Sequence, residues 1–233
     1  MYERFARWYD RLTGNVDYAA RADYFEEIIA RHRRGEGKLL LDLACGTGTL
    51  SLLLAQRGWD VIGVDGSGDM LAQAQAKAAM CEARPLFLCQ EMEELDLYGT
   101  VDVCLCTLDS LNHVLTTDGL RRIFARLRLF VETDGLFIFD VNTPYKHRQV
   151  LGNSAFLYDE GDVFCAWQNE LAEENIVDIR LDFFEKEGDN RYRRRTETFS
   201  ERAYTEEELC RAAEGFMLEA VYGGDTFLPP AER

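Results

Sequence analysis

The sequence predicts an α/β protein with a doubly wound, mostly parallel sheet, helices on both faces and an antiparallel β excursion after the fifth strand. Between residues 38 and 141, apolar runs typical of strands covered on both faces alternate with helical patterns, as parallel strands joined by crossover helices require. After about residue 153, extended segments of alternating polarity follow one another instead, which is typical of antiparallel strands.

The elements of the parallel part follow from periodicity. Residues 5–34 carry apolar positions at helical spacing and end in a basic run broken by Gly35. Strands are expected at residues 38–43, 59–65, 85–89, 101–106 and 136–141. Helices are expected between them at residues 50–56, 70–81 and 120–131.

The later part of the chain returns from extended segments to a helix. The expected antiparallel segments are residues 163–170, 176–185 and 192–202, with a turn at residues 187–190. Thr205 and Glu208 have the spacing of a capping box, which predicts the start of a helix. Residues 216–222 then predict a returning strand, the sixth of the main sheet.

No linker, repeat or low-complexity tract divides the chain, so we expect a single domain over residues 1–233. Within it, residues 1–34 are expected to form a helical cover, and residues 153–202 an antiparallel β lid. The parallel core takes residues 35–152 and 203–233.

Composition narrows the partners and the compartment. The 26 basic and 42 acidic residues give a formal charge of −16, which disfavours nucleic acid and anionic membranes as partners. The seven cysteines are an odd number without a Cys-x-x-Cys pair, which is typical of reduced thiols in a cytoplasm. No apolar stretch reaches the length of a signal peptide or a membrane span, so we expect a cytoplasmic protein.

The strongest chemical signal is the loop at residues 42–48, where the first strand meets its helix. Gly46 and Gly48 would let a ligand lie against the backbone beside the free N–H groups of the helix start. Asp65, at the end of the second strand, is placed to accept hydrogen bonds from a ribose diol, although it could instead cap the next helix. Ser51 stands where a dinucleotide fingerprint has its third glycine, so that fingerprint is imperfect.

Three segments in order, residues 42–48, 63–71 and 90–92, resemble the motifs of the class I S-adenosylmethionine-dependent methyltransferases. Residues 108–113 and the antiparallel excursion resemble the small-molecule bacterial group related to glycine N-methyltransferase. The resemblance implies a Rossmann-like fold, S-adenosyl-L-methionine as cofactor, and a small-molecule acceptor methylated on nitrogen, oxygen or carboxylate by a monomer or homodimer. It also implies a seventh strand, for which the chain after residue 230 is too short. We therefore expect that slot to be empty or filled in some other way, as a shortened gene product would leave it.

The same resemblance implies a role for individual residues around the cofactor. The methionine moiety, the ribose and the sulfonium would be met by Asp42, Ala44, Cys45, Gly46, Gly48, Asp65, Thr107 and Leu108. The adenine would be met by Gly66, Met70, Glu91 and Met92, and the aromatic covers would be Tyr9 and Tyr18. Glu91 could instead be a solvated acid, and both tyrosines could be ordinary helix packing.

Asp109 and His113 are the candidate catalytic residues. They follow the fourth strand at the switch point where open α/β sheets bind ligands, and a helical turn would place them on one face. An imidazole with a pKa near neutrality suits a general base, and the carboxylate would orient an ammonium. The alternative is that His113 caps the next helix.

Two rival functions stay open, a nicotinamide-dependent oxidoreductase and a regulator that binds S-adenosylmethionine without transfer. Other features favour structural roles. Cys104 and Cys106 alternate as core residues, so we expect no metal site. The arginines at residues 191–195 are expected to pair with acids across a hairpin, and residues 142–145 only partly match the Asn-Pro-Pro-Tyr box of nucleic-acid methyltransferases.

Overall fold

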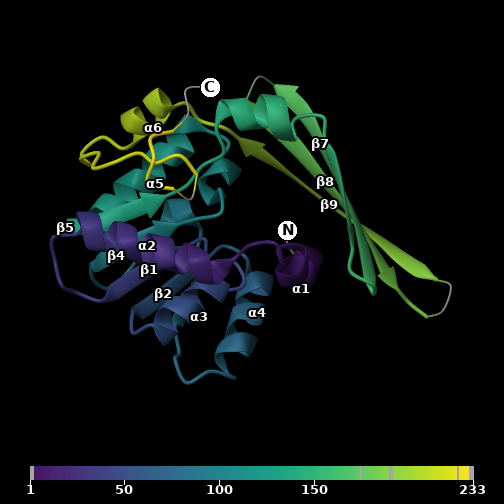
Figure 1. The fold of residues 1–233 in the computed structure, drawn as a ribbon, viewed down its shortest axis with the longest axis horizontal. Helices are drawn as coiled ribbons and strands as arrows, with labels where there is room; N and C mark the ends of the chain where they lie inside the picture. The colour runs from purple at the N-terminus through teal and green to yellow at the C-terminus, as the bar shows by residue number, and fades with distance from the viewer. Residues whose placement is uncertain (1–2, 174, 189–190, 225, 231–233) are drawn as a thin grey trace.

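The computed structural model describes residues 3–173, 175–188, 191–224 and 226–230. Its main sheet has five parallel strands in the order β3-β2-β1-β4-β5 (Figure 1). The bounds are β1 Leu39–Leu43, β2 Asp60–Asp65, β3 Leu86–Cys89, β4 Val101–Cys106 and β5 Val131–Phe139. From β1 the chain adds β2 and then β3 on one side, and β4 then pairs with β1 on its other side. The carboxyl ends of β1 and β4 therefore form the topological switch point.

Helices cover both faces of this sheet, which confirms the predicted doubly wound fold (Figure 1). Their bounds are α1 Glu3–Leu12, α2 Tyr18–His32, α3 Thr49–Gln56, α4 Gly68–Ala78, α5 Thr117–Phe130 and α6 Glu206–Ala212. The helical pattern of residues 5–34 is divided, because Asp17 accepts a hydrogen bond from the Ala20 N–H and starts α2 afresh. The capping box of Thr205 and Glu208 is present at α6.

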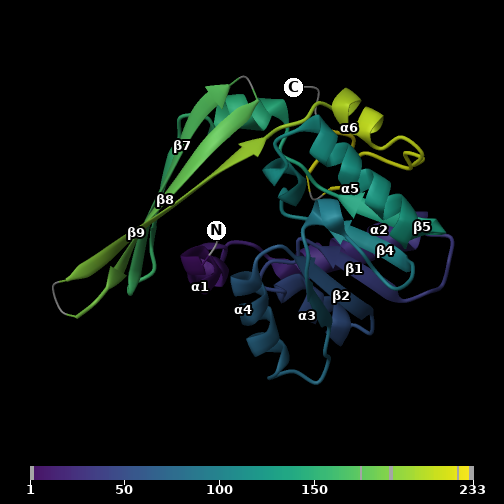
Figure 2. The same cartoon turned by 180° about the vertical axis from the view of Figure 1, so that it is seen from behind.

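A second, antiparallel sheet of four strands follows β5 and stands beside the main body (Figure 2). It comprises β6 Ala155–Asp159, β7 Val163–Glu173, β8 Ile176–Lys186 and β9 Tyr192–Arg202. Three of these strands were predicted; β6 was missed, as was the π-helix η3 (Lys146–Leu151) before it. Arg194 pairs with Asp182 and Arg193 with Glu187, which confirms the charge-paired interpretation for these two arginines of the basic run. The turn at residues 187–190 lies partly outside the described residues.

Helix α1 lies between this sheet and the main body (Figures 1 and 2). Phe5 and Trp8 pack into an apolar cluster with the inward residues of β7 and β8 and with Met70 of α4. The Trp8 indole N–H donates to Glu185 at 2.8 Å. The amino-terminal segment is therefore held from both sides, directly above the carboxyl ends of the strands.

The prediction of a sixth strand at residues 216–222 is wrong, because this segment forms no strand. Phe216 packs on Phe124 and Phe137 at one face of the main sheet, whereas Tyr222 bonds His32 of α2. The segment thus links the layers on either side of β5 and does not pair with it. Among the described residues the main sheet has five strands, with neither a sixth nor a seventh. No helix in the described part of the chain has the length and apolar character of a membrane span.

Candidate active site

The loops after β1 and β4 leave the sheet side by side in left-handed backbone conformations. Ala44 has φ 59° and Gly46 φ 55° in the first loop, and Leu108 has φ 56° and Asp109 φ 52° in the second. Three of these four residues carry a side chain, for which this conformation costs about 1–3 kcal/mol. Such strain on two neighbouring loops is typical of a ligand site.

A narrow cavity lies between these two loops. Its wall contains eight of the predicted cofactor residues, Tyr9, Tyr18, Asp42, Ala44, Cys45, Gly46, Thr107 and Leu108. It also contains four residues that the sequence analysis missed, Thr47, Thr49, Leu50 and Ser110. Gly48, Asp65, Gly66, Met70, Glu91 and Met92 lie outside this wall, as do Asp109 and His113.

Gly46 and Gly48 have different tasks. A Cβ on Gly46 would meet nothing within 4 Å, so the backbone there is open to a ligand. A Cβ on Gly48 would lie 2.8 Å from the Phe87 ring and 2.9 Å from Ala74, so this glycine lets α3, α4 and β3 approach one another. Because Gly48 also lies outside the cavity wall, its contact with the ligand stays a prediction.

Exchanging each glycine for alanine should separate these tasks. Gly48→Ala should lower the free energy of unfolding in two ways. An alanine in the left-handed conformation costs about 1–2 kcal/mol, and overpacking against Phe87 and Ala74 costs about 1–3 kcal/mol. Gly46→Ala has only the first of these costs. We expect Gly48→Ala to lower the free energy of unfolding more and Gly46→Ala to weaken ligand binding more. Urea unfolding and calorimetric titration measure the two effects, and the reverse order would contradict the assignment.

Asp65 organises the first loop from the end of β2. Its carboxylate accepts from the N–H of Gly46 and from the N–H of Ser67, both at 2.8 Å. The cap of α4 is Ser67, whose hydroxyl accepts from the Met70 N–H, so the interpretation of Asp65 as that cap is wrong. A carboxylate offers about four acceptor positions, and the two backbone bonds leave room for a diol.

Asp42 and Ser51 form a buried pair under the same loop. The Ser51 hydroxyl donates to the carboxylate, and burial raises the pKa of Asp42 to about 7. This bond gives residue 51 a function that the third glycine of a dinucleotide fingerprint could not perform. The departure from that fingerprint thus has a physical cause.

Gly66 and Glu91, two of the residues predicted for the adenine, lie in contact. The Glu91 carboxylate lies against Gly66, 2.7 Å from where a Cβ would stand, and Met92 begins the 3₁₀ turn η1 (Met92–Glu94). The first N–H groups of such a turn have no partner within it, which suits the predicted backbone contact. Met70 instead packs in the apolar cluster around α1, so its predicted contact with the adenine has no support from its position.

The aromatic covers are tied to the loop by a residue that the sequence analysis missed. Asp10 of α1 accepts from Thr47 Oγ1 at 2.5 Å and from Lys77 Nζ of α4 at 2.7 Å. Burial raises the pKa of Tyr9 and of Tyr18, and the two hydroxyls are hydrogen-bonded. Both tyrosines therefore present neutral rings over the cavity.

A second group of side chains surrounds the loop after β4. Asn142 Nδ2 donates to Asp109 Oδ2 at 2.6 Å, and the Asp109 N–H donates to Asp140 Oδ1 at 2.7 Å. Arg21 of α2 forms an ion pair with Asp140. Burial raises the pKa of Asp109 and of Asp140, although the Asp140 side chain is still 37% exposed, so two partly buried carboxyl groups lie together beside this loop.

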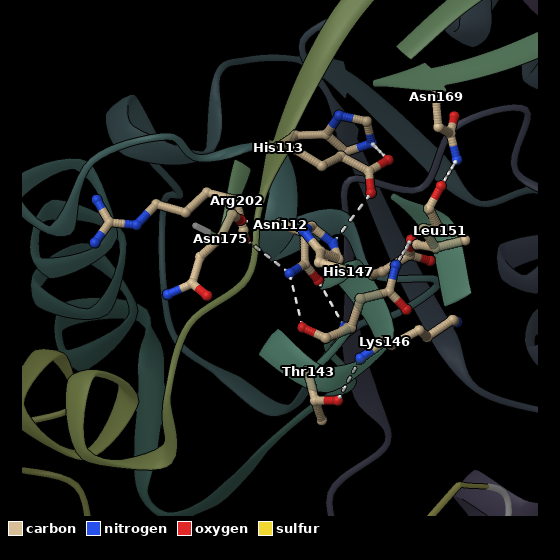
Figure 3. A network of polar contacts seen from close by, with 12 residues as sticks. Asn112, His113, Thr143, Lys146, His147, Leu151, Asn169, Asn175 and Arg202 are labelled. Carbon is tan, nitrogen blue, oxygen red and sulfur yellow. Dashed lines mark hydrogen bonds and ion pairs between the residues drawn. The ribbon is translucent and has the colours of Figure 1, made fainter. Parts of the chain in front are cut away.

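The amide of Asn112 joins three segments at this point (Figure 3). Its Nδ2 donates to the carbonyls of Asn142 and Arg202, and its Oδ1 accepts from the Asn142 N–H. Asn112 is fully buried, so water could not take the place of its amide as the hydrogen-bond partner of these three backbone groups. The loops after β4 and β5 and the end of β9 are thus fixed to one side chain.

Asn112→Ala should therefore destabilise the fold strongly. Each buried group left without a partner costs about 1–3 kcal/mol, and we expect a total loss of about 3 kcal/mol or more in the free energy of unfolding. Asn15→Ala, at an exposed position, is the matched control and should change little. Equal unfolding midpoints for the two variants would show that Asn112 does not join the segments.

His113 ends the 3₁₀ turn η2 (Ser110–His113), which begins directly after Asp109. Its Nε2 lies 3.9 Å from Glu201 Oε1 of β9, and Glu201 Oε2 lies 3.8 Å from His147 Nε2 of η3 (Figure 3). Residues three apart in a 3₁₀ turn share a face, so His113 follows Ser110 of the cavity wall. Thr116 caps α5, so the capping alternative for His113 is wrong.

Glu201 and His147 were missed because neither belongs to a motif. Glu201 is 5% exposed, although it lies in a strand that otherwise resembles a solvated hairpin. A sequence signal existed in the alternation of β9, which places residue 201 on the same face as Phe199. Burial raises the pKa of Glu201 to about 8 and lowers that of His113 to about 4.

These shifts predict how stability depends on pH. Glu201 and Asp42 bind protons more tightly in the folded state, so their contribution is present at low pH and is lost as pH rises through about 7 to 8. The lowered pKa of His113 has the opposite effect: it makes the free energy of unfolding rise with pH, but only between about pH 4 and the ordinary histidine pKa near 6.5. We expect the free energy of unfolding to fall between about pH 6.5 and 8, and Glu201→Gln to flatten this slope. Urea titrations at several pH values measure it, and a rising slope in wild type would contradict the assignment.

Cys104 and Cys106 are fully buried in β4, and burial raises the pKa of both thiols. In the described ranges no three histidine, cysteine or acidic side chains are grouped as metal ligands would be. The two cysteines are therefore residues of the core.

Comparison with known proteins identifies the family. A family model described as a methyltransferase domain matches residues 40–135. A methyltransferase-family protein of Geobacillus sp. (strain WCH70) is 34% identical over 204 residues, which cover 87% of this chain and 83% of that protein. The crystal structure of an S-adenosylmethionine-dependent methyltransferase from Clostridium acetobutylicum is 32% identical, with a TM-score of 0.86 over 99% of this chain and 94% of that one.

The chain belongs to the class I S-adenosylmethionine-dependent methyltransferases. Membership of this family argues against the alternative function of a nicotinamide-dependent oxidoreductase. The methyltransferase is also 30% identical to a glycine/sarcosine N-methyltransferase of Parasynechococcus marenigrum over 185 residues, 75% of this chain and 61% of that protein.

The residues of the methyltransferase fit S-adenosylmethionine, the cofactor of its family. The backbone at Gly46 is open, the Asp65 carboxylate has unused acceptor positions, and Tyr9 and Tyr18 offer neutral rings above the loop. These groups would hold the amino acid part, the ribose and the cationic sulfonium, respectively. Ring faces attract cations, which suits the last of these assignments.

Proposed function

We propose that this methyltransferase methylates the nitrogen of a small-molecule amine. The observation that carries the proposal is the pair of carboxyl groups beside the loop after β4, where the Asp109 N–H donates to Asp140 Oδ1 and Asn142 Nδ2 donates to Asp109 Oδ2. Two carboxyl groups held this close together favour a cationic ligand over an anionic one. The relative named as a glycine/sarcosine N-methyltransferase supports a nitrogen acceptor.

The proposed mechanism needs few residues. When bound, S-adenosylmethionine supplies a methyl group on a sulfonium, which is an excellent leaving group, so positioning contributes most of the rate. Asp109 orients the acceptor ammonium, and Asn142 in turn holds Asp109. His113 takes the proton that the nitrogen must lose. Burial lowers its pKa to about 4, so the imidazole is neutral and able to accept a proton, but it is a weaker base than the near-neutral pKa expected from the sequence would give.

We further propose that residues 1–34 and 153–202 act as the cover and the lid of a single domain over residues 1–233, with residues 35–152 and 203–233 as its core. The supporting contacts are those of Asp10 with Thr47 and of Phe5 and Trp8 with the second sheet. A monomer or homodimer in the cytoplasm, without nucleic acid or membrane as partner, fits the charge of −16.

Matched acceptors test the proposed reaction. Panels of amines, alcohols and carboxylic acids on the same carbon skeletons are incubated with methyl-labelled S-adenosylmethionine and the full chain. We expect label in the amines alone. Label in alcohols or acids would overturn the nitrogen assignment, and binding of the cofactor without transfer to any panel or to a metabolite extract would favour the regulator.

A further inference from the structure

The buried imidazole of His147 lacks one partner that its chemistry requires. Its Nδ1 lies 3.2 Å from the carbonyl oxygen of Asn175, and a carbonyl can only accept, so Nδ1 carries the hydrogen. The Nε2 of a neutral His147 is then an acceptor. This atom is buried and has no hydrogen-bond partner in the described residues, and it faces Glu201 Oε2 at 3.8 Å.

An ionised carboxylate cannot satisfy that nitrogen, because both groups would offer only lone pairs. A proton on Glu201 supplies the missing donor once the 3.8 Å separation shortens to hydrogen-bond length. Burial and the negative charge of Asp109 favour a proton on Glu201. The positive charge of Lys146 and the hydrogen bond from the Asn142 amide favour the ionised form, but their effect is smaller. His113 and His147 face the carboxyl group from η2 and η3.

The second oxygen of the same carboxyl group faces His113. With the proton on the side of His147, Glu201 Oε1 is a carbonyl oxygen and can accept only from an Nε2–H of His113, which it faces at 3.9 Å. That tautomer leaves the lone pair of His113 on Nδ1. The separations of 3.8 and 3.9 Å are longer than hydrogen bonds, so both contacts must shorten in the free protein for the two tautomers to be fixed.

We propose that Glu201 acts in its protonated form as a positioning residue, donating to His147 and accepting from His113, so that Nδ1 of His113 is the base. The use of Nδ1 in the reaction rests on the proposed function, but the two tautomers do not. In the reaction, the acceptor nitrogen would form its bond to methyl with its lone pair while the bond between methyl and the sulfonium breaks, leaving that electron pair on a neutral thioether sulfur. The proton of the acceptor nitrogen passes to Nδ1 of His113. The imidazolium later releases that proton to solvent.

Glutamine and leucine at position 201 test the proposal. Glu201→Gln imitates the protonated carboxyl, since its amide both accepts and donates, whereas Glu201→Leu can do neither. We expect imidazole nitrogen spectra of the full chain at pH 7 to show His113 as the Nε2–H and His147 as the Nδ1–H tautomer in wild type and Glu201→Gln. Glu201→Leu should lose the fixed tautomer of His113.

Kinetics on an identified amine give the second measurement. We expect Glu201→Gln to keep turnover within a few-fold of wild type at pH 7 and to abolish the loss of turnover above about pH 8, and Glu201→Leu to lose at least about tenfold. An Nε2–H tautomer in His147, or equal losses in both variants, would overturn the proposal. The spectra need no acceptor, so failure of the proposed amine reaction would leave the tautomer test standing.

Discussion

His113→Ala is expected to lower the turnover number of the methyltransferase about 10²–10⁴-fold while leaving the affinity for S-adenosylmethionine unchanged, because removal of a general base costs about that factor. His113 lies outside the wall of the cofactor cavity, on the face of η2 that continues from Ser110. Steady-state kinetics on an identified amine and calorimetric titration with the cofactor measure the two quantities.

The matched control is His32→Ala. His32 bonds the Tyr222 hydroxyl at the far end of α2, away from both loops of the site. We expect its turnover to equal that of wild type. Turnover of His113→Ala within a few-fold of wild type would return His113 to a structural role and leave positioning alone as the source of the rate.

Asp65→Ala should weaken S-adenosylmethionine binding by about 1.5–3 kcal/mol, the usual value of hydrogen bonds to a charged group. The carboxylate also holds the Gly46 and Ser67 N–H groups, so the first loop loses its anchor as well as its proposed ribose contact. Calorimetric titration measures the loss, with Asp69→Ala in the exposed first turn of α4 as the control. Equal affinities for the two variants would refute the role of Asp65.

Much of the fold could be predicted because the parallel sheet imposes a local pattern. Each strand from β1 to β4 is an apolar run with a helix or turn after it, and the structure confirms them nearly residue for residue. Residues 216–222 are a counterexample. They have the apolar content of a strand, but their ends are held by Phe124 and His32, contacts that local periodicity does not reveal.

The cofactor loop could also be predicted, because its glycines and Asp65 lie within one strand-helix-strand unit. The acceptor side could not. Glu201 reaches His113 from 88 positions along the chain, and His147 lies on a π-helix that no periodicity indicates. Such contacts arise from how the second sheet docks, which depends on the packing of α1 and Asn112 and not on any local motif.

We expect the methyltransferase to transfer a methyl group from S-adenosylmethionine to the nitrogen of a small molecule. Incubation of the full chain with cofactor carrying a ¹³C methyl group, together with a fractionated cell extract, measures this transfer, because carbon spectra distinguish methyl groups on nitrogen from those on oxygen. We expect new N-methyl signals in the low-molecular-mass, cationic fraction, absent with Asp65→Ala. Label in the nucleic acid or protein fraction, or only in O-methyl signals, would contradict it.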